Sequence, residues 1–268
     1  MATLTISGSP LPTADPGDLG FIPERLAQLG PTMQRYVDDG KVPNLVTLVA
    51  RHGRVAHFEA RGVMDLDEPQ PVQRDSIFRL YSNSKPIAGA GVMILFEEGK
   101  VTPDDPISKF IPAFKNAQVR TNQPGVTVPA QREITVRDCF RNTSGIASAG
   151  RAPMGYSGQY RTEMETLGWP GSIERAVGSR SARERVDALG KLPLSFQPGS
   201  DYEYHAGYIV IGAIIEEVTG RSLNEFYHQR IFDRIGMNDT DFYLGDGKLD
   251  RFTACYRPTN RDGRWGLT

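Results

Sequence analysis

Residues 80–86 read LYSNSKP and lead directly into an apolar helical pattern that continues to Phe96. Ser82 and Lys85 stand three positions apart in the first turn of that helix, so both side chains share one face and the amine can reach the hydroxyl. The positive end of the helix dipole favours the negative charge that develops in acyl transfer. A capping serine explains Ser82 equally well, and about one S-x-x-K pattern is expected by chance in a chain of this length. The spacing alone makes Ser82 a candidate nucleophile but does not distinguish it from a capping serine.

A serine nucleophile needs a base, and the sequence offers two kinds. The histidine candidates are His52, His57, His205 and His228. Each is more often a surface or packing residue, and no G-x-S-x-G elbow supports an α/β-hydrolase triad. The other kind is lysine with tyrosine, whose ordinary pKa values of about 10 must be lowered by their surroundings.

Residues 197–208 read QPGSDYEYHAGY and place several tyrosines at a loop-to-helix junction. A tyrosine there, Tyr204 in particular, is a candidate partner for the serine. Aromatic residues at such a junction also plug a helix against the core, and the residues by themselves leave both interpretations open.

The rest of the chain indicates an α+β plan with segregated elements. We expect a helix of about four turns from Pro23 to a stop at Gly40. Residues 45–51 and 55–62 around the turn signal at residues 52–53 predict a β-hairpin. Further on, the strong patterns are helical, at residues 87–95, 182–189 and 208–218, with another helix opening at the capping-box spacing of residues 222–225.

These patterns suggest three parts. We expect a flexible lead-in at residues 1–20, a sheet-containing subdomain from residues 21–80 and 245–268, and a mainly helical subdomain at residues 81–244. The loop at residues 145–171, rich in Gly, Pro and Ser, is a candidate lining for a site.

Composition excludes several classes of function. The 268 residues carry a formal net charge of -1, with 39% hydrophobic and 24% charged residues, which favours small neutral substrates over nucleic acid or a membrane surface. Cys139 and Cys255 lack the short spacings of a zinc site, so we expect free thiols, no metal and no cofactor. We see no signal peptide and no apolar run of membrane-spanning length. A cytoplasmic protein is expected, or a periplasmic one if a leader has been removed.

Several blocks in a fixed order resemble one known family, which comprises the class C β-lactamases, the D-Ala-D-Ala carboxypeptidases and the family VIII carboxylesterases. The blocks lie at residues 82–86 (S-x-x-K and a proline), 135–146 (TVRD to NTSGI), 198–204 (PG to the tyrosine), 211–220 and 231–240. The resemblance covers roughly residues 23–245 and is most like the family VIII carboxylesterases. It implies a β-lactamase/transpeptidase-like fold, with an antiparallel sheet flanked by helices and a mainly helical subdomain. It also implies that Ser82 is the nucleophile, that Lys85 helps to deprotonate it, and that Tyr204 passes the proton to the leaving group.

Three departures from the family pattern shape the expected function. The family tyrosine begins Y-x-N, whereas Tyr204 is followed by His205 and Ala206, which favours esters over β-lactams. We assign His205 and Tyr81 to substrate binding, and we treat the literal Y-x-N at residues 81–83 as coincidence. Asn142 stands where the family often has histidine, a change with no clear consequence in the sequence.

The third departure concerns the end of the chain. Family members continue into strands that carry a K-T-G, H-x-G or W-G-G box and supply an oxyanion amide, whereas this chain ends at Thr268. We therefore expect C-terminal strands to be missing, either because the chain is a piece of a longer polypeptide or because they come from elsewhere.

The leading hypothesis is a serine carboxylesterase that acts on a small-molecule ester through an acyl-enzyme, and homo-oligomerisation stays open. The alternatives are a β-lactamase or D-Ala-D-Ala carboxypeptidase, and a non-catalytic or truncated member of the fold.

Overall fold

The computed structural model describes residues 11–123, 125–146, 182–204, 206–258 and 265–267. Its α-helices are α1 (Pro23–Leu26), α2 (Leu29–Asp38), α3 (Lys85–Glu97), α4 (Val136–Arg141), α6 (Ala182–Gly190), α7 (Ala206–Thr219), α8 (Leu223–Tyr227) and α9 (Asp233–Ile235). Short 3-10 turns lie at η1 (Tyr81–Ser84), η2 (Ile107–Lys109), η3 (Pro112–Phe114) and η6 (Leu249–Arg251), and a π-helical turn at η5 (His228–Phe232). The strands are β1 (Asn44–Arg51), β2 (Arg54–Gly62), β3 (Gln118–Arg120), β4 (Thr127–Pro129), β5 (Tyr256–Pro258) and β6 (Trp265–Leu267).

The chain divides into two compact units, which are described separately. One unit combines Met1–Tyr81 with His228–Thr268, and the other is Ser82–Tyr227. The described strands pair antiparallel in three two-stranded sheets, β1 with β2, β3 with β4 and β5 with β6. The domain boundaries expected from the sequence, at residues 80 and 245, stay a prediction.

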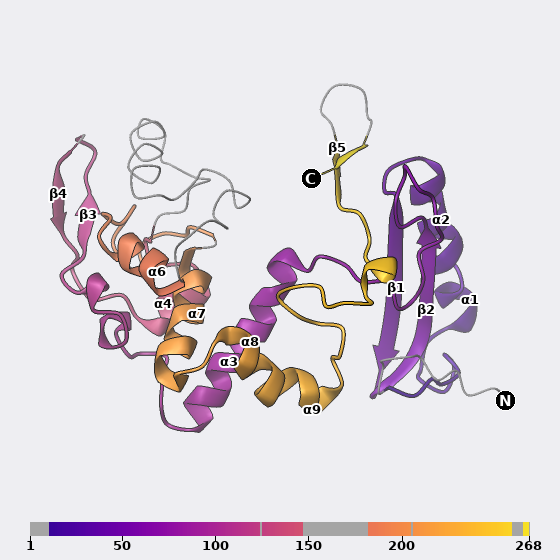
Figure 1. Cartoon of the computed structure of the whole chain (residues 1–268), viewed down its shortest axis with the longest axis horizontal. Helices are drawn as coiled ribbons and strands as arrows, with labels where there is room; N and C mark the ends of the chain where they lie inside the picture. Colours follow the sequence, from indigo (N-terminus) through magenta and orange to yellow (C-terminus); the bar gives the residue numbers. More distant parts are fainter. Residues whose placement is uncertain (1–10, 124, 147–181, 205, 259–264, 268) are drawn as a thin grey trace. The chain divides into compact units, whose positions relative to one another are not determined.

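The β1–β2 hairpin of the first unit confirms the sequence prediction. Its register runs from Asn44 opposite Gly62 to Arg51 opposite Arg54, and α2 packs alongside it (Figure 1). His52 and Gly53 form the turn with φ of 51° and 70°. Positive φ at both central residues is the turn geometry that matches the twist of a two-residue hairpin.

The expected single helix at residues 23–40 is instead two helices, α1 and α2, which break at Ala27 and Gln28. Pro31 supplies the reason. It has no backbone N–H to donate to the carbonyl of Ala27, and proline is tolerated only in the first turn of a helix. A new helix therefore starts at Leu29, with Pro31 in its first turn.

The segment that leads toward Ser82 is held within the first unit by main-chain hydrogen bonds. The Ile77 amide donates to the Arg251 carbonyl at 2.6 Å, and the Thr253 amide donates to the Ile77 carbonyl at 2.9 Å. Arg251 in turn makes a two-pronged contact with Asp239 at 2.7 and 2.8 Å. Hydrogen bonds from Arg251 lower the pKa of the Asp239 carboxyl to about 2.

Helix α7 forms the centre of the second unit and packs against α3 and α4 (Figure 1). Ile211, Ile214 and Ile215 of α7 are fully buried. Burying each such side chain contributes about 1.5–3 kcal/mol. Helices α6, α7 and α8 confirm the helical patterns read from the sequence, including the capping contact from the Glu225 amide to Ser222 Oγ at 3.3 Å.

A glycine sets the distance between α4 and α7. A Cβ at Gly207 would lie 2.5 Å from the Cys139 carbonyl oxygen and 2.8 Å from the Cys139 Cα. These are backbone atoms of α4, so they cannot swing aside. We expect Gly207→Ala to lower the free energy of unfolding by about 1–3 kcal/mol, because it forces the two helices apart.

Urea unfolding followed by circular dichroism measures this effect, and Gly89→Ala is the matched control. A Cβ at Gly89 meets nothing nearer than Phe140 Cε1 at 3.9 Å. In a helix this second change is expected to be neutral or to stabilise by up to about 1 kcal/mol. Equal destabilisation by the two variants would show that close helix contact at Gly207 is not the cause.

Candidate active site

Ser82 and Lys85 lie at the N-terminal end of α3, in the turn η1 and in the first residue of the helix. Lys85 Nζ donates a hydrogen bond to Ser82 Oγ at 3.0 Å. The N-cap position of α3 belongs to Ser84, not to Ser82. The structure therefore does not support the alternative explanation that Ser82 is the N-cap of the helix.

Tyr204 lies in the extended segment just ahead of α7, and its hydroxyl donates to Ser82 Oγ at 2.7 Å. Lys85 Nζ also lies 4.5 Å from the centre of the Tyr204 ring. Hydrogen bonding to Lys85, and then to Ser82, lowers the pKa of the Tyr204 phenol. The side chain is 41% exposed, so it does not plug the core as the alternative reading supposed. The structure thus brings Ser82, Lys85 and Tyr204 together around one oxygen atom.

The segment that carries Tyr204 is fixed by main-chain hydrogen bonds to the residues that follow α4. The Glu203 amide donates to the Asn142 carbonyl at 2.8 Å, and the Gly199 amide donates to the Thr143 carbonyl at 2.7 Å. Asn142 ends α4 in the left-handed conformation, with φ of 57°. Asparagine tolerates that conformation better than most residues, which gives a structural role to the position where the sequence departs from the family pattern.

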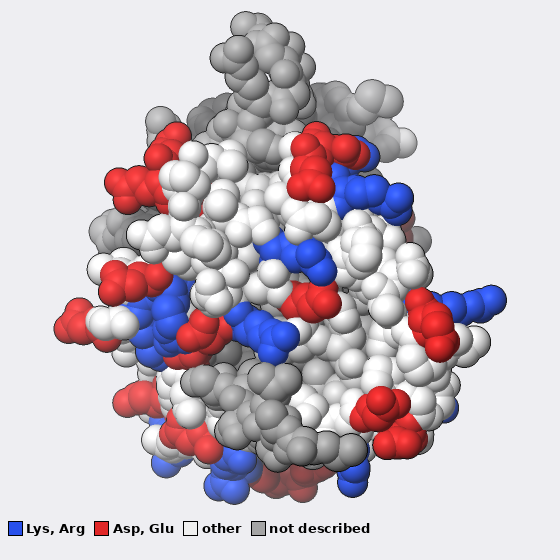
Figure 2. Space-filling model, turned by 90° about the vertical axis from the view of Figure 1, so that its right-hand side faces the viewer, with Lys and Arg blue, Asp and Glu red and all other residues white. Residues whose placement is uncertain are grey.

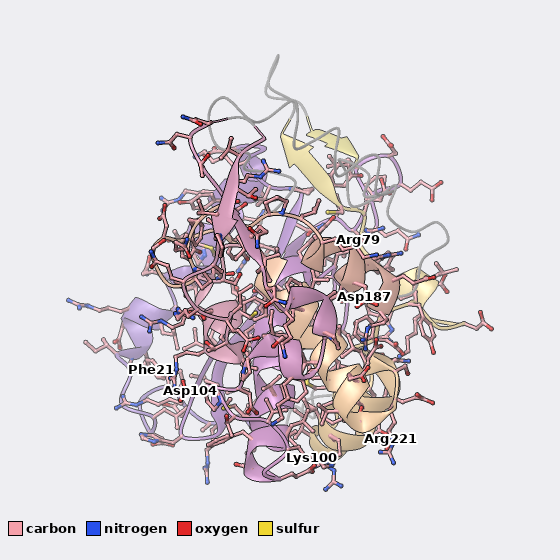
Figure 3. The ribbon with its side chains drawn as sticks, turned by 90° about the vertical axis from the view of Figure 1, so that its left-hand side faces the viewer. Phe21, Arg79, Lys100, Asp104, Asp187 and Arg221 are labelled. Carbon is pink, nitrogen blue, oxygen red and sulfur yellow. The ribbon has the colours of Figure 1, made fainter. Side chains whose placement is uncertain are left out.

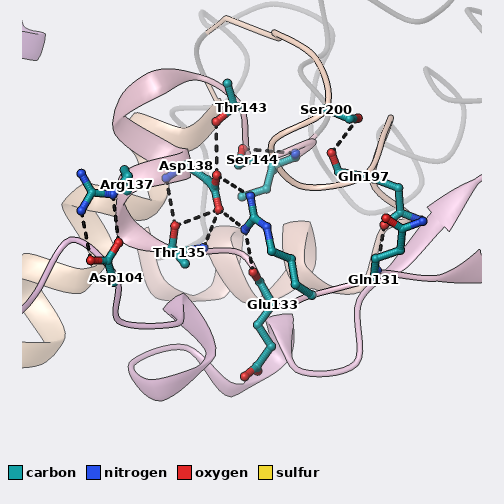
Figure 4. Close-up of polar contacts among 12 residues, drawn as sticks. Asp104, Gln131, Glu133, Thr135, Arg137, Asp138, Thr143, Ser144, Gln197 and Ser200 are labelled. Atoms are coloured by element: carbon teal, nitrogen blue, oxygen red, sulfur yellow. Dashed lines mark hydrogen bonds and ion pairs between the residues drawn. The ribbon is translucent and has the colours of Figure 1, made fainter.

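The buried carboxylate of Asp138 holds the residues around the end of α4 together (Figure 4). Asp138 is 5% exposed and receives hydrogen bonds from Arg132 at 2.5 and 2.9 Å. It also accepts from the amide of Thr135 at 2.9 Å and from the hydroxyl of Thr143 at 3.2 Å. Burial alone raises the pKa of Asp138, but hydrogen bonds from Arg132 and Thr135 outweigh it, so the pKa lies below the ordinary value. The spacing of Thr135 and Asp138 is that of a capping box, so the sequence could have indicated the contact between these two residues. It gives no sign of the contact with Arg132.

We expect Asp138→Asn to lower the free energy of unfolding by about 1.5–3 kcal/mol, because it removes charged hydrogen bonds from a buried site. Asp104→Asn is the matched control, since Asp104 pairs with Arg137 at 2.9 and 3.0 Å but is 74% exposed and lies at the surface (Figure 3). Solvent screens such an exposed pair, so it contributes little to stability. Denaturant unfolding at neutral pH compares the two, and equal losses would contradict the buried role of Asp138.

The stability difference between the wild type and Asp138→Asn should depend on pH. Because the folded state lowers the pKa of Asp138, its stabilisation is present above the unfolded-state pKa of about 3.9 and disappears as the pH falls through the folded-state value. The difference in stability between wild type and Asp138→Asn should therefore shrink on acidification. A difference that grows with acid would show the opposite sign of the shift.

Comparison with known proteins identifies the family. A family model described as beta-lactamase matches residues 30–267. The chain belongs to the beta-lactamase family. Membership confirms the β-lactamase/transpeptidase-like fold and places the chain in a serine hydrolase superfamily. The relatives of this chain include esterases.

Three proteins similar to this chain show how far the likeness extends. Protein Rv1367c of Mycobacterium tuberculosis is 29% identical over 238 residues, spanning 86% of this chain and 55% of that protein. Esterase EstB of Burkholderia gladioli is 26% identical over 230 residues, spanning 86% of this chain and 54% of that protein. The solved structure of EstCE1, a hydrolase with promiscuous acyltransferase activity, superposes with a TM-score of 0.75 at 27% identity, covering 91% of this chain and 58% of that one. The chain spans about half the length of the curated relatives it matches.

The remaining residues singled out in the sequence belong to the other compact unit or fall outside the described residues. Tyr81 belongs to the other compact unit, is 61% exposed, and its hydroxyl lies 3.6 Å from Cys255 Sγ. His205 and residues 147–171 of the Gly- and Ser-rich loop fall outside the described residues. His52, His57 and His228 also belong to the other unit.

Both cysteines are free thiols in the structure. Cys139 is buried in α4, and burial raises the pKa of its thiol. Within the described residues, no helix is long and apolar enough to cross a membrane.

Proposed function

We propose that this protein is a carboxylesterase that hydrolyses small neutral esters through an acyl-enzyme on Ser82. The observation that carries the proposal is the convergence on Ser82 Oγ of Lys85 Nζ at 3.0 Å and the Tyr204 hydroxyl at 2.7 Å. A nucleophile within hydrogen-bonding reach of a base, with a cation orienting that base, is the arrangement that activates a serine.

Acylation begins when the Tyr204 phenolate takes the proton from Ser82 Oγ. The oxygen then attacks the ester carbonyl carbon and forms a new C–O bond, and the carbonyl electrons move onto the oxyanion. Ser82 lies at the start of α3, where backbone amides lack helical acceptors, so its amide is the expected oxyanion donor. When the oxyanion collapses, the bond to the alcohol oxygen breaks and the alcohol leaves with the proton from Tyr204.

Deacylation repeats these steps with water. Tyr204 takes a proton from the water, the hydroxide oxygen bonds to the acyl carbon, and the bond to Ser82 Oγ breaks. Ser82 regains its proton from Tyr204, and the carboxylic acid is released. The Lys85 side chain beside Tyr204 stabilises the phenolate form, in keeping with the lowered pKa of that phenol.

Three observations favour neutral esters as the substrates. Tyr204 is followed by His205 and Ala206 in place of the Asn of the β-lactamase pattern. EstB and EstCE1 are an esterase and a hydrolase by name. The formal net charge of -1 leaves no overall excess of one sign, and Figure 2 shows described acidic and basic side chains interspersed on one face. A charged substrate would be better served by a field of one sign.

The test compares two chromogenic substrates. We expect p-nitrophenyl butyrate to give a burst of p-nitrophenol followed by steady turnover, because acylation precedes a separate hydrolytic step. A chromogenic cephalosporin should have the smaller kcat/KM. The reverse preference would favour a β-lactamase or a D-Ala-D-Ala peptidase, the activity for which a relative from Escherichia coli, 25% identical over 241 residues, is named.

A further inference from the structure

Tyr208 lies in the first turn of α7, four residues after Tyr204 in the sequence. Lys85 Nζ is 5.6 Å from the centre of the Tyr208 ring and 4.5 Å from the centre of the Tyr204 ring. Two aromatic rings, one from the segment ahead of α7 and one from its first turn, therefore face the same cation. Only one of them, Tyr204, also contacts Ser82.

The Tyr208 side chain makes two contacts with Phe140 of α4. Its hydroxyl donates to the Phe140 carbonyl at 3.4 Å, and its ring meets the Phe140 ring edge-on with centres 6.0 Å apart and an angle of 86°. The neighbouring Gly207 lets α7 approach the α4 backbone closely. Tyr208 is half-buried and held by these contacts, so its ring has little freedom to move. The side chain of Lys85 beside it is long and flexible.

We propose that Tyr208 is a positioning residue that keeps the Lys85 ammonium beside Ser82 Oγ and Tyr204. This inference rests on the proposed esterase function and adds a residue to it. The negative face of an aromatic ring attracts a cation but not a neutral amine. The Tyr208 ring therefore restricts the positions that the Lys85 ammonium can take.

The consequence for catalysis follows from the groups that face Tyr204. Lys85 of α3 is the cation beside its phenol, Ser82 is its hydrogen-bonding partner, and Tyr208 and Tyr202 are the titratable neighbours on its own segment. A nearby ammonium favours the phenolate over the phenol. If the ammonium moves away, Tyr204 loses its proton only at higher pH, and the acidic limb of kcat/KM shifts upward.

The experiment replaces the Tyr208 ring in graded steps. Tyr208→Phe keeps the ring face and removes the hydroxyl, whereas Tyr208→Leu removes the ring. Because Leu also alters packing, a series of phenylalanines with one, two and three ring fluorines at position 208 weakens the cation–π attraction at nearly constant shape. Tyr208→Phe is the reference for the series, because it keeps the edge-on contact with the Phe140 ring and loses only the 3.4 Å hydrogen bond. Relative to this reference, the acidic limb of kcat/KM should rise with each fluorine, and by about half a pH unit when the attraction is lost.

A second measurement separates this inference from the proposed function. The rate at which a fluorophosphonate probe labels Ser82 does not require ester turnover, and it should fall along the same series. A limb and a labelling rate that stay constant across the series, in a protein that hydrolyses the ester, would overturn the positioning role alone. A wild-type protein that neither hydrolyses the ester nor takes the probe would overturn the proposed function and this inference with it.

Discussion

Ser82→Ala is expected to abolish ester hydrolysis and the burst of alcohol, with a loss in kcat of about 10⁴-fold or more. The reason is that the Lys85 and Tyr204 side chains both converge on Ser82 Oγ, and alanine leaves them with no nucleophile to activate. Turnover of p-nitrophenyl butyrate by the purified variant measures the effect.

Ser222→Ala is the control for this change. Ser222 also stands at the start of a helix, where its hydroxyl accepts from the Glu225 amide at 3.3 Å. Losing such a cap costs about 1 kcal/mol of stability but should leave turnover unaltered. The two serines thus separate a capping role from a nucleophilic one, and an unchanged burst in Ser82→Ala would rule out Ser82 as the nucleophile.

Tyr204→Phe is expected to lower kcat/KM by about 10²–10⁴-fold, the usual contribution of a positioned general base. The ring and its contact with Lys85 remain, whereas the oxygen that exchanges a proton with Ser82 is lost. Tyr202→Phe is the matched control, because Tyr202 lies two residues away in the same segment and is 52% exposed. Equal activity in the two variants would show that the phenol of Tyr204 takes no part in the reaction.

The pH dependence of the wild type carries a sign that can be checked with the same assay. If the phenolate is the base, as proposed, kcat/KM should rise with pH through the pKa of Tyr204 and level off above it. The structure lowers that pKa below the ordinary value for tyrosine, so the limb should lie below a pH of about 10. In Tyr204→Phe the limb should disappear.

Local patterns in the sequence predicted the elements that depend on local chemistry. The positive φ values at His52 and Gly53 give the hairpin its tight turn, and the S-x-x-K spacing puts Ser82 and Lys85 on one face. The likeness to a known family supplied Tyr204, because nothing in the loop sequence distinguished it from a tyrosine that packs against a helix. The three groups come together only in the folded chain.

Other features depend on contacts that the sequence does not display. Pro31 interrupts a periodic helical pattern through a single missing N–H. Asn142 and Thr143 support the segment that carries Tyr204 through main-chain bonds to Glu203 and Gly199, across a separation in sequence that leaves no local signal. Tyr208 resembles an ordinary core aromatic until the ring is seen over Lys85.

The most direct measurement is the location of the acyl group during turnover. The protein is quenched in acid within the burst of an activated ester, digested, and analysed by mass spectrometry. We predict one acyl group per chain, on the peptide that contains Ser82, and none in Ser82→Ala. An acyl group on another residue, or a burst that leaves no covalent adduct, would contradict nucleophilic catalysis by Ser82.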